Sequence, residues 1–119
     1  MVDESIVGAV QAYMRALQAQ GLDVKFGVLF GSWVKGRANQ WSDIDLLIIS
    51  PQFDNGRDDH WVNLLWRTAA RVDSRIEPIA CGERQWNEHD ASAIIEIARR
   101  EGERIDLPIE VTPTPNTSA

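Results

Sequence analysis

Two aspartates separated by one residue, Asp43 and Asp45, lie at the start of an apolar run that ends at Ile49. Residues two apart on a β-strand point to the same face, so the two carboxylates should project side by side. Two unit charges about 4 Å apart repel by roughly 1 kcal/mol in water and roughly 4 kcal/mol at an effective dielectric of 20. A proton or a hard divalent cation neutralises such a pair. Asp43 and Asp45 are therefore candidate metal ligands.

A Gly-Ser pair precedes these aspartates. Gly31 and Ser32 follow the apolar run 26–30, and ten residues separate Ser32 from Asp43. Gly31 lets the backbone approach phosphate oxygens, and the amides that follow it can form an anion-binding nest at the start of a short helix. Ser32 can donate its hydroxyl to a phosphate oxygen. A lone Asp-x-Asp pair often does no more than begin a strand, but the Gly-Ser pair upstream favours phosphate chemistry.

The segment 31–46 contains Gly-Ser-x-x-Lys-Gly followed by Ser-Asp-Ile-Asp-Leu. It resembles the signature of the nucleotidyltransferase superfamily that includes the polymerase-β-like palm, and it is most similar to the minimal nucleotidyltransferases (MNT proteins). In prokaryotes these proteins are often paired with small helical HEPN proteins as toxin–antitoxin couples. The resemblance covers roughly residues 24–105, and its motif is specific because it fixes glycines, serines and aspartates in a strand–loop–strand context. It implies Mg²⁺ or Mn²⁺ as cofactor and ATP as substrate.

The resemblance also implies a third carboxylate on the strand beside the Asp-x-Asp strand. That strand offers Glu77, whereas Asp73 precedes it in a turn. A mid-strand carboxylate is unfavourable to bury unless it is paired or metal-bound, so Glu77 is preferred to Asp73. The family usually has Asp here, and the extra methylene of Glu77 moves the group that should activate the nucleophile. We expect Asp43, Asp45 and Glu77 to be both the metal ligands and the catalytic residues.

Four residues are expected to contact the nucleotide: Gly31, Ser32, Lys35 and Ser42. Lys35 and Arg37 can offset charge on the pyrophosphate leaving group, although exposed basic residues on a short helix are usually only solvated. Ser42 has a second interpretation, a hydrogen bond to the loop backbone. Nucleotidyl transfer depends mainly on positioning and charge neutralisation. Two metal ions would clamp the attacking and leaving oxygens of an in-line displacement.

Helical and strand periodicities alternate along the chain, which predicts an α/β domain of two layers. The apolar run 44–49 should be a central strand, and Pro78 places the strand 75–81 at the sheet edge. Periodicity leaves the strand order open, whereas the family resemblance implies a mixed three-stranded sheet in the order 1-2-3 with about four helices. Helices are predicted around Ile6–Leu17, in a short turn over Trp33–Arg37, from Trp61 to Val72 and from about Ala91 to Arg100, with Ile94, Ile95, Ile97 and Ala98 inward, and strands over Val24–Phe30, Ile44–Ile49 and Arg75–Cys81.

Length and composition bound the remaining possibilities. The 119 residues make one domain, and the net charge of -6 argues against general nucleic-acid binding. The single Cys81 excludes an internal disulfide and favours the cytoplasm, and no apolar run approaches the roughly 20 residues of a membrane span. No signal peptide is expected, because acidic residues follow Met1. We expect a nucleotidyltransferase domain over residues 1–106 and a disordered tail over 107–119.

Functions of different classes fit these observations. The first is transfer of a nucleoside monophosphate, AMP from ATP, to a tyrosine hydroxyl of a partner HEPN-type toxin, with this chain as the antitoxin. The second is a binding module that neutralises its partner by occupying it, which Glu77 in place of Asp keeps open. Nucleotidylation of a small molecule is a third, but relatives with that activity carry an additional helical domain that 119 residues do not supply.

A nucleotidyltransferase core without a substrate domain needs a docking surface, on a partner protein or in a homo-oligomer. Trp33 and Trp41 flank the site, and their roles stay open between partner anchor, base stacking and packing. His60 and His89 lack companions at zinc-ligand spacing and are expected to be surface residues. Cys81 is expected to be a buried small hydrophobe.

Overall fold

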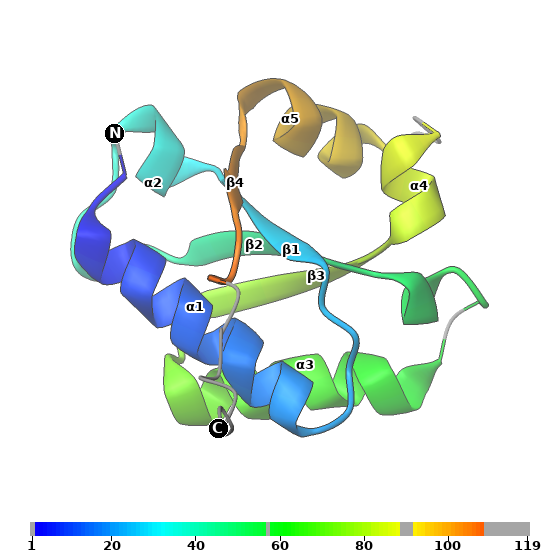
Figure 1. The fold of residues 1–119 in the computed structure, drawn as a ribbon. Coiled ribbons are helices and arrows are strands. Elements are labelled where there is room, and N and C mark those ends of the chain that lie inside the picture. Colours follow the sequence, from blue (N-terminus) through cyan, green and yellow to red (C-terminus); the bar gives the residue numbers. More distant parts are fainter. Residues whose placement is uncertain (1, 57, 89–91, 109–119) are drawn as a thin grey trace, which may run out of the picture.

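The computed structural model describes residues 2–56, 58–88 and 92–108. Helices and strands alternate along most of this length (Figure 1). In chain order the elements are α1 (Glu4–Ala19), β1 (Phe26–Phe30), α2 (Ser32–Lys35), β2 (Ile44–Ser50), the 3-10 helix η1 (Pro51–Phe53), α3 (Asp59–Val72), β3 (Ile76–Gly82), α4 (Glu83–Asn87), α5 (Ala93–Glu101) and β4 (Glu103–Ile105).

The strands form one mixed sheet in the order β3-β2-β1-β4. β1 runs antiparallel to β2 and β4, whereas β2 and β3 are parallel. The predicted order of strands 1-2-3 is confirmed, and β2 is central as predicted. β3 lies at the sheet edge, also as predicted, where the missing backbone N–H of Pro78 is tolerated because one side of an edge strand has no partner. The predicted count of three strands is wrong. β4 is a fourth strand of three residues, and it is too short to give a period-two signal.

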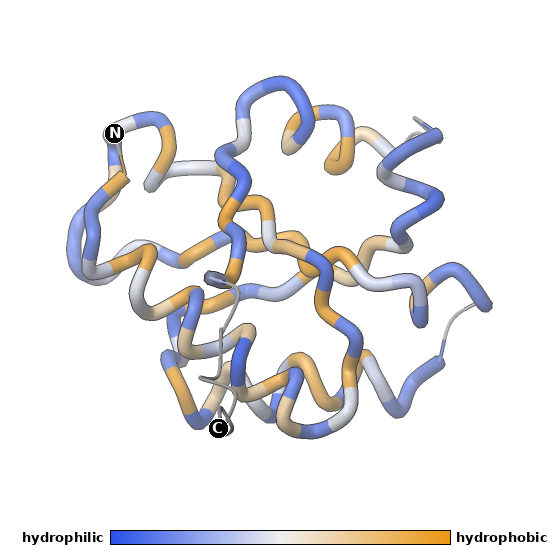
Figure 2. Tube along the Cα trace, viewed as in Figure 1, coloured by the Kyte–Doolittle hydropathy of each residue, from blue (hydrophilic) through white to orange (hydrophobic). Residues whose placement is uncertain are grey.

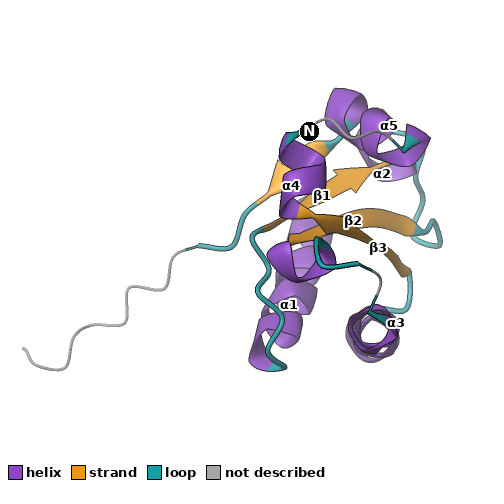
Figure 3. Cartoon of the chain, turned by 90° about the vertical axis from the view of Figure 1, so that its right-hand side faces the viewer, coloured by secondary structure: helices purple, strands orange, loops and turns teal. Residues whose placement is uncertain are grey.

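Both faces of the sheet are covered by helices, so the predicted two-layer arrangement is corrected to three layers (Figures 1 and 3). Leu46 and Ile48 belong to the apolar core shared with α1 and α3, whereas Leu47 and Ile49 belong to a second core shared with α5. Figure 2 shows the apolar residues gathered along the sheet and polar residues at the outer turns. β2 is buried from both sides, as its continuous apolar sequence predicts.

The strand β1 begins at Phe26, two residues later than predicted. Phe26, Val28 and Phe30 alternate toward the α5 core as expected, but Val24 packs in the core on the opposite face. The chain crosses from one core to the other before the strand starts. The predicted alternation is therefore confirmed only from Phe26 onward.

The two long helices on the α1 and α3 face are capped by acidic residues. The side chain of Asp3 accepts from the Ser5 amide at the start of α1, and Asp58 accepts from the His60 amide at the start of α3. Buried Tyr13 of α1 donates its hydroxyl to the Leu65 carbonyl of α3 at 2.8 Å. This bond fixes the two helices against each other beneath the sheet.

The helices on the opposite face differ most from the prediction. The short helix α4 was not predicted, which raises the α-helices to five among the described residues. In α5, Ile95 and Ala98 are buried as expected, but Ile94 and Ile97 are 42% and 36% exposed instead of inward. The side of α5 that carries Ile95 and Ala98 packs on the sheet, and the side that carries Ile94 and Ile97 stays partly open to solvent.

Some expectations fall outside the described residues. These are the predicted start of the last helix at Ala91, the surface position of His89, and residues 109–119, which make up most of the expected tail. Within the part of the chain that is described, no helix has both the length and the apolar character that crossing a membrane requires.

Candidate active site

The parallel pairing of β2 and β3 brings two predicted carboxylates level. Asp45 is opposite Glu77 on β3 and opposite Phe30 on β1. Residues two apart on a strand share a face, so Asp45 lies on the same face as Leu47, and Glu77 on the same face as Ile79. Leu47 and Ile79 pack in the core beneath α5, so both carboxylates belong to the sheet face that carries α5. Asp43 precedes Asp45 by two residues. We call Asp43, Asp45 and Glu77 the acidic cluster.

The three side chains of the acidic cluster interact electrostatically. Burial raises the pKa of half-buried Asp45, and the neighbouring charge of Asp43 raises it further. The pKa of Glu77 is raised by desolvation first, then by the charges of Asp43 and Asp45, and by a hydrogen bond with Asp43 that favours the protonated form. In the absence of a cation, a proton thus relieves part of the repulsion, as expected for carboxylates that share one site.

Gly31 is the residue that allows Asp45 to lie against the loop formed by Gly31 and Ser32. Its backbone has φ 79° and ψ -148°, a region that essentially only glycine adopts. A Cβ at this position would overlap the Oδ2 atom of Asp45. The glycine predicted for close approach to phosphates therefore has a second role, because it brings the loop and the acidic cluster into direct contact.

The substitution Gly31→Ala should cost about 1–3 kcal/mol of stability through backbone strain. It should also displace the Asp45 carboxylate and abolish Mg²⁺-dependent ATP binding. Gly36→Ala is the matched control, because Gly36 also has positive φ, 73°, but a Cβ at that position would have open space within 4 Å among the described residues. Thermal denaturation and calorimetric titration measure both effects. Equal ATP affinity in the two variants would show that the contact between Gly31 and Asp45 has no role in nucleotide binding.

Ser32 opens the short helix α2 directly after Gly31. The amides of Val34 and Lys35 both donate to the Gly31 carbonyl at 3.1 Å. The first amides of a helix, here those of Ser32 and Trp33, have no intrahelical acceptor and point out of its N-terminus. The half-buried Ser32 hydroxyl lies at the same end. This arrangement agrees with the predicted phosphate contact, which stays a prediction.

Lys35 lies at the other end of α2 and pairs with a residue that the sequence did not indicate. Its Nζ atom is 2.9 Å from Oε1 of Glu101, at the end of α5. The hydrogen bond and charge of Lys35 lower the pKa of Glu101. Arg37 is exposed. A role for Lys35 or Arg37 at the pyrophosphate remains a prediction.

Ser42 bonds the loop backbone, which is the second of its two predicted interpretations. Its hydroxyl accepts from the Asn39 amide at 3.0 Å, and its amide donates to the Asn39 carbonyl at 2.9 Å. The Ser42 carbonyl in turn accepts from Nε1 of Trp33 at 3.3 Å. Trp33 is half-buried against the core on the α1 and α3 face, so packing accounts for it. Trp41, by contrast, is 80% exposed.

Asp73, the residue rejected in favour of Glu77 as the third carboxylate, lies in a turn as predicted. It ends α3 and accepts three hydrogen bonds from Arg75, at 2.7–3.0 Å, which lower its pKa. Sequence reasoning missed Arg75, whose Nη1 also donates to the Gln40 carbonyl at 3.2 Å. The Asp-x-Arg spacing could have predicted the pairing of Asp73 with Arg75. The hydrogen bond from Arg75 to the Gln40 carbonyl depends on tertiary structure and could not have been predicted.

The donor set of the acidic cluster fits a hard divalent cation, because it offers only carboxylate oxygens from adjacent strands. Across residues 2–56, 58–88 and 92–108, no three His, Cys, Asp or Glu side chains already stand in a metal-coordinating arrangement. Metal binding therefore requires the carboxylates to turn toward the ion.

The raised pKa values give a stability prediction for the metal-free protein. A carboxyl group whose pKa is raised by folding binds more protons in the folded state than in the unfolded state at pH values between its two pKa values. The free energy of unfolding therefore falls as the pH rises from about 4 through the raised pKa values of Asp45 and Glu77. Asp43→Asn removes a charge that raises both. It should therefore increase the melting temperature in EDTA by a few degrees at pH 7.5 and by much less at pH 4. Destabilisation of equal size at both pH values would mean that Asp43 has a structural role instead.

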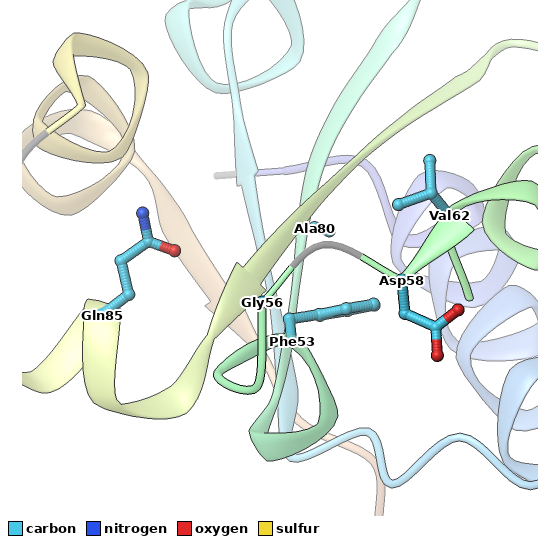
Figure 4. Close-up of a pocket in the computed structure, with 6 residues that line it drawn as sticks. All are labelled: Phe53, Gly56, Asp58, Val62, Ala80 and Gln85. Atoms are coloured by element: carbon cyan, nitrogen blue, oxygen red, sulfur yellow. The ribbon is translucent and has the colours of Figure 1, made fainter. Parts of the chain in front are cut away.

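A separate pocket of about 410 Å³ lies elsewhere on the molecule. Its lining residues are Phe53, Gly56, Asp58, Val62, Ala80 and Gln85 (Figure 4). Ala80 packs on the core that faces α1 and α3, whereas Asp45 and Glu77 belong to the other face of the sheet. The pocket and the acidic cluster are therefore different places, and the carboxylate chemistry belongs to the cluster.

Comparisons with known proteins show the fold and the family. Two solved structures share the fold at a TM-score of 0.55 each. One is a Sulfolobus solfataricus protein assigned as a nucleotidyltransferase, with 15% identity over 69% of this chain and 71% of that chain. The other is a toxin-antitoxin structure with AMP-PNP, with 18% identity over 83% of this chain and 74% of that chain. No curated protein matches the chain.

A family model supplies the sequence-level match. The model described as "Nucleotidyltransferase domain" matches residues 12–107, which include every residue of the acidic cluster and the Gly31–Ser32 pair. The resemblance based on those residues is thereby confirmed at the level of this family. The chain belongs to the nucleotidyltransferase domain family.

Proposed function

We propose that this chain transfers AMP from ATP to a hydroxyl group of a partner protein, with Mg²⁺ or Mn²⁺ held by the acidic cluster. The observation that carries the proposal is the contact of the Gly31 loop with Asp45, level with Glu77 in the register of β2 and β3. This contact supports a site in which the Gly31–Ser32 backbone binds phosphate beside three carboxylates. Nucleotidyl transfer needs this combination, because positioning and charge neutralisation dominate its catalysis.

Each residue has a role in the proposed reaction. The amides after Gly31 and the Ser32 hydroxyl bind phosphate oxygens, and Asp43 and Asp45 hold the cation. When bound, that cation neutralises charge on the triphosphate and on the leaving oxygen. Glu77 accepts the proton of the acceptor hydroxyl, for which a raised pKa is favourable. The acceptor oxygen forms a bond to the α-phosphorus as the bond to the β-phosphate oxygen breaks and pyrophosphate leaves.

We further propose that the acceptor is a tyrosine of a HEPN-type toxin and that the chain acts in the cytoplasm as its antitoxin. The motif over residues 31–46 supports this as a resemblance to MNT proteins. The fold that the chain shares with a toxin-antitoxin structure containing AMP-PNP supports it independently. A neighbouring reading frame encoding a small helical protein with an Arg-x-x-x-x-His motif would identify the partner.

Intact-mass spectrometry of that partner tests the proposal. After incubation with this chain and ATP-Mg²⁺, the partner should gain the mass of AMP at a tyrosine and lose toxicity. The alternative function is a non-catalytic binding module, which Glu77 in place of Asp keeps open. If the toxin is neutralised while its mass stays unchanged, the binding module is the correct function.

A further inference from the structure

Trp41 is a large aromatic side chain that the fold leaves uncovered. It is 80% exposed, whereas the next most exposed large apolar side chain among the described residues, Trp66, is 51% exposed. Trp41 stands two residues before Asp43 of the acidic cluster. Exposing a tryptophan forgoes a large burial energy. Its place beside the site therefore calls for a functional explanation.

The loop that carries Trp41 is held by hydrogen bonds on both sides of the exposed ring. The Trp41 amide donates to Oδ1 of Asn39 at 2.9 Å. Asn39 and Ser42 bond each other twice, and Nε1 of Trp33 holds the Ser42 carbonyl. The backbone around Trp41 is thus fixed, so a contact with its ring loses little conformational entropy.

A further hydrogen bond ties this loop to the residue that precedes β3. Arg75 donates to the Gln40 carbonyl, and its guanidinium carbon lies 5.9 Å from the ring centroid of Trp33. Arg75 directly precedes β3, two residues before Glu77. The Trp41 loop is therefore tied to α2 through Trp33 and to the start of β3 through Arg75, and it leads directly into Asp43 of the acidic cluster.

We propose that Trp41 is a positioning residue for the acceptor protein. It packs on an apolar or aromatic side chain of the partner segment that carries the hydroxyl nucleophile, and it holds that hydroxyl beside Glu77. This rests on the proposed function. Trp33 takes no part in the contact, because it is half-buried and bonded to Ser42. Tryptophan is enriched among the residues that dominate binding energy at protein interfaces.

The test uses Trp41→Ala, the conservative variant Trp41→Phe, and Trp66→Ala as the exposed control. The probe is the acceptor protein of the proposed function, purified separately and titrated by calorimetry. Trp41→Ala should weaken its binding at least tenfold, about 1.4 kcal/mol, while Trp41→Phe recovers most of the affinity and Trp66→Ala changes nothing. The melting temperature should not change, because the ring is exposed.

Transfer kinetics separate the acceptor from the nucleotide. Trp41→Ala should raise the KM for the partner protein about tenfold and leave the KM for ATP within twofold. A rise in the KM for ATP alone would make Trp41 a base-stacking residue and would overturn the proposal, as would unchanged partner affinity. If the wild-type chain transfers no AMP, the proposed enzymatic function fails, but the calorimetric affinities still decide the role of Trp41.

Discussion

Replacing Asp43 and Asp45 together by asparagine should abolish nucleotidyl transfer and remove the Mg²⁺ dependence of ATP binding. Losing a single charge-stabilising donor typically lowers kcat by about 10²–10³-fold, and this variant loses two charged ligands of the proposed cation at once. The fold should persist, because the two substitutions remove the charge repulsion that adds to desolvation in raising the pKa of Glu77. Loss of activity would therefore not reflect unfolding.

Calorimetric titration of ATP with and without Mg²⁺ measures this effect. The matched control is Asp23→Asn/Asp106→Asn, which removes the same charge from exposed residues paired with Lys25 and Arg104. The control should bind ATP-Mg²⁺ like the wild type, whereas Asp43→Asn/Asp45→Asn should bind ATP equally weakly in both conditions. Wild-type affinity in Asp43→Asn/Asp45→Asn would place the nucleotide elsewhere.

Glu77→Gln should lower the rate of transfer by about 10²–10⁴-fold while ATP-Mg²⁺ binding stays largely intact. A group that takes a proton in the transition state contributes little to ground-state binding, so kcat should fall without a matching change in KM for ATP. The amide keeps the size of Glu77 and removes both its negative charge and its ability to accept the proton as a carboxylate.

Glu77→Asp is the informative partner of that variant. It introduces the residue usual for the family and shortens the side chain by one methylene. Because it keeps the carboxylate, it should retain substantial transfer activity where Glu77→Gln does not. If Glu77→Gln and the wild type transfer AMP at the same rate in single-turnover measurements, Glu77 is not the base, and the acceptor hydroxyl is activated by another group.

The local part of the site could be predicted from the sequence because strand geometry determines it. Strand periodicity predicts that Asp43 and Asp45 project side by side, and a glycine after β1 predicts close backbone approach. The parallel register that sets Glu77 opposite Asp45 follows from strand neighbours that only the family resemblance implied. The positions of these residues could be predicted because they depend on short-range backbone geometry or on a specific sequence motif.

The remaining features depend on contacts between distant segments. β4 exists because Ile105 pairs with Gly27, and three residues carry no period-two pattern. The helix α4 begins where Asp54 accepts from the Arg84 amide, thirty positions along the chain. The exposure of Ile94 and Ile97 follows from how α5 lies on the sheet. Composition and periodicity cannot specify such contacts, because they describe one segment at a time.

The position of a label in ATP tests the proposed transfer most directly. This chain, Mg²⁺ and the partner protein are incubated with ATP labelled at either the α-phosphate or the γ-phosphate. Nucleotidyl transfer predicts label from α-labelled ATP on the partner, none from γ-labelled ATP, and pyrophosphate in equal amount, all absent with Asp43→Asn/Asp45→Asn. Label from the γ-phosphate, or a neutralised partner with no label from either ATP, would contradict nucleotidyl transfer by the acidic cluster.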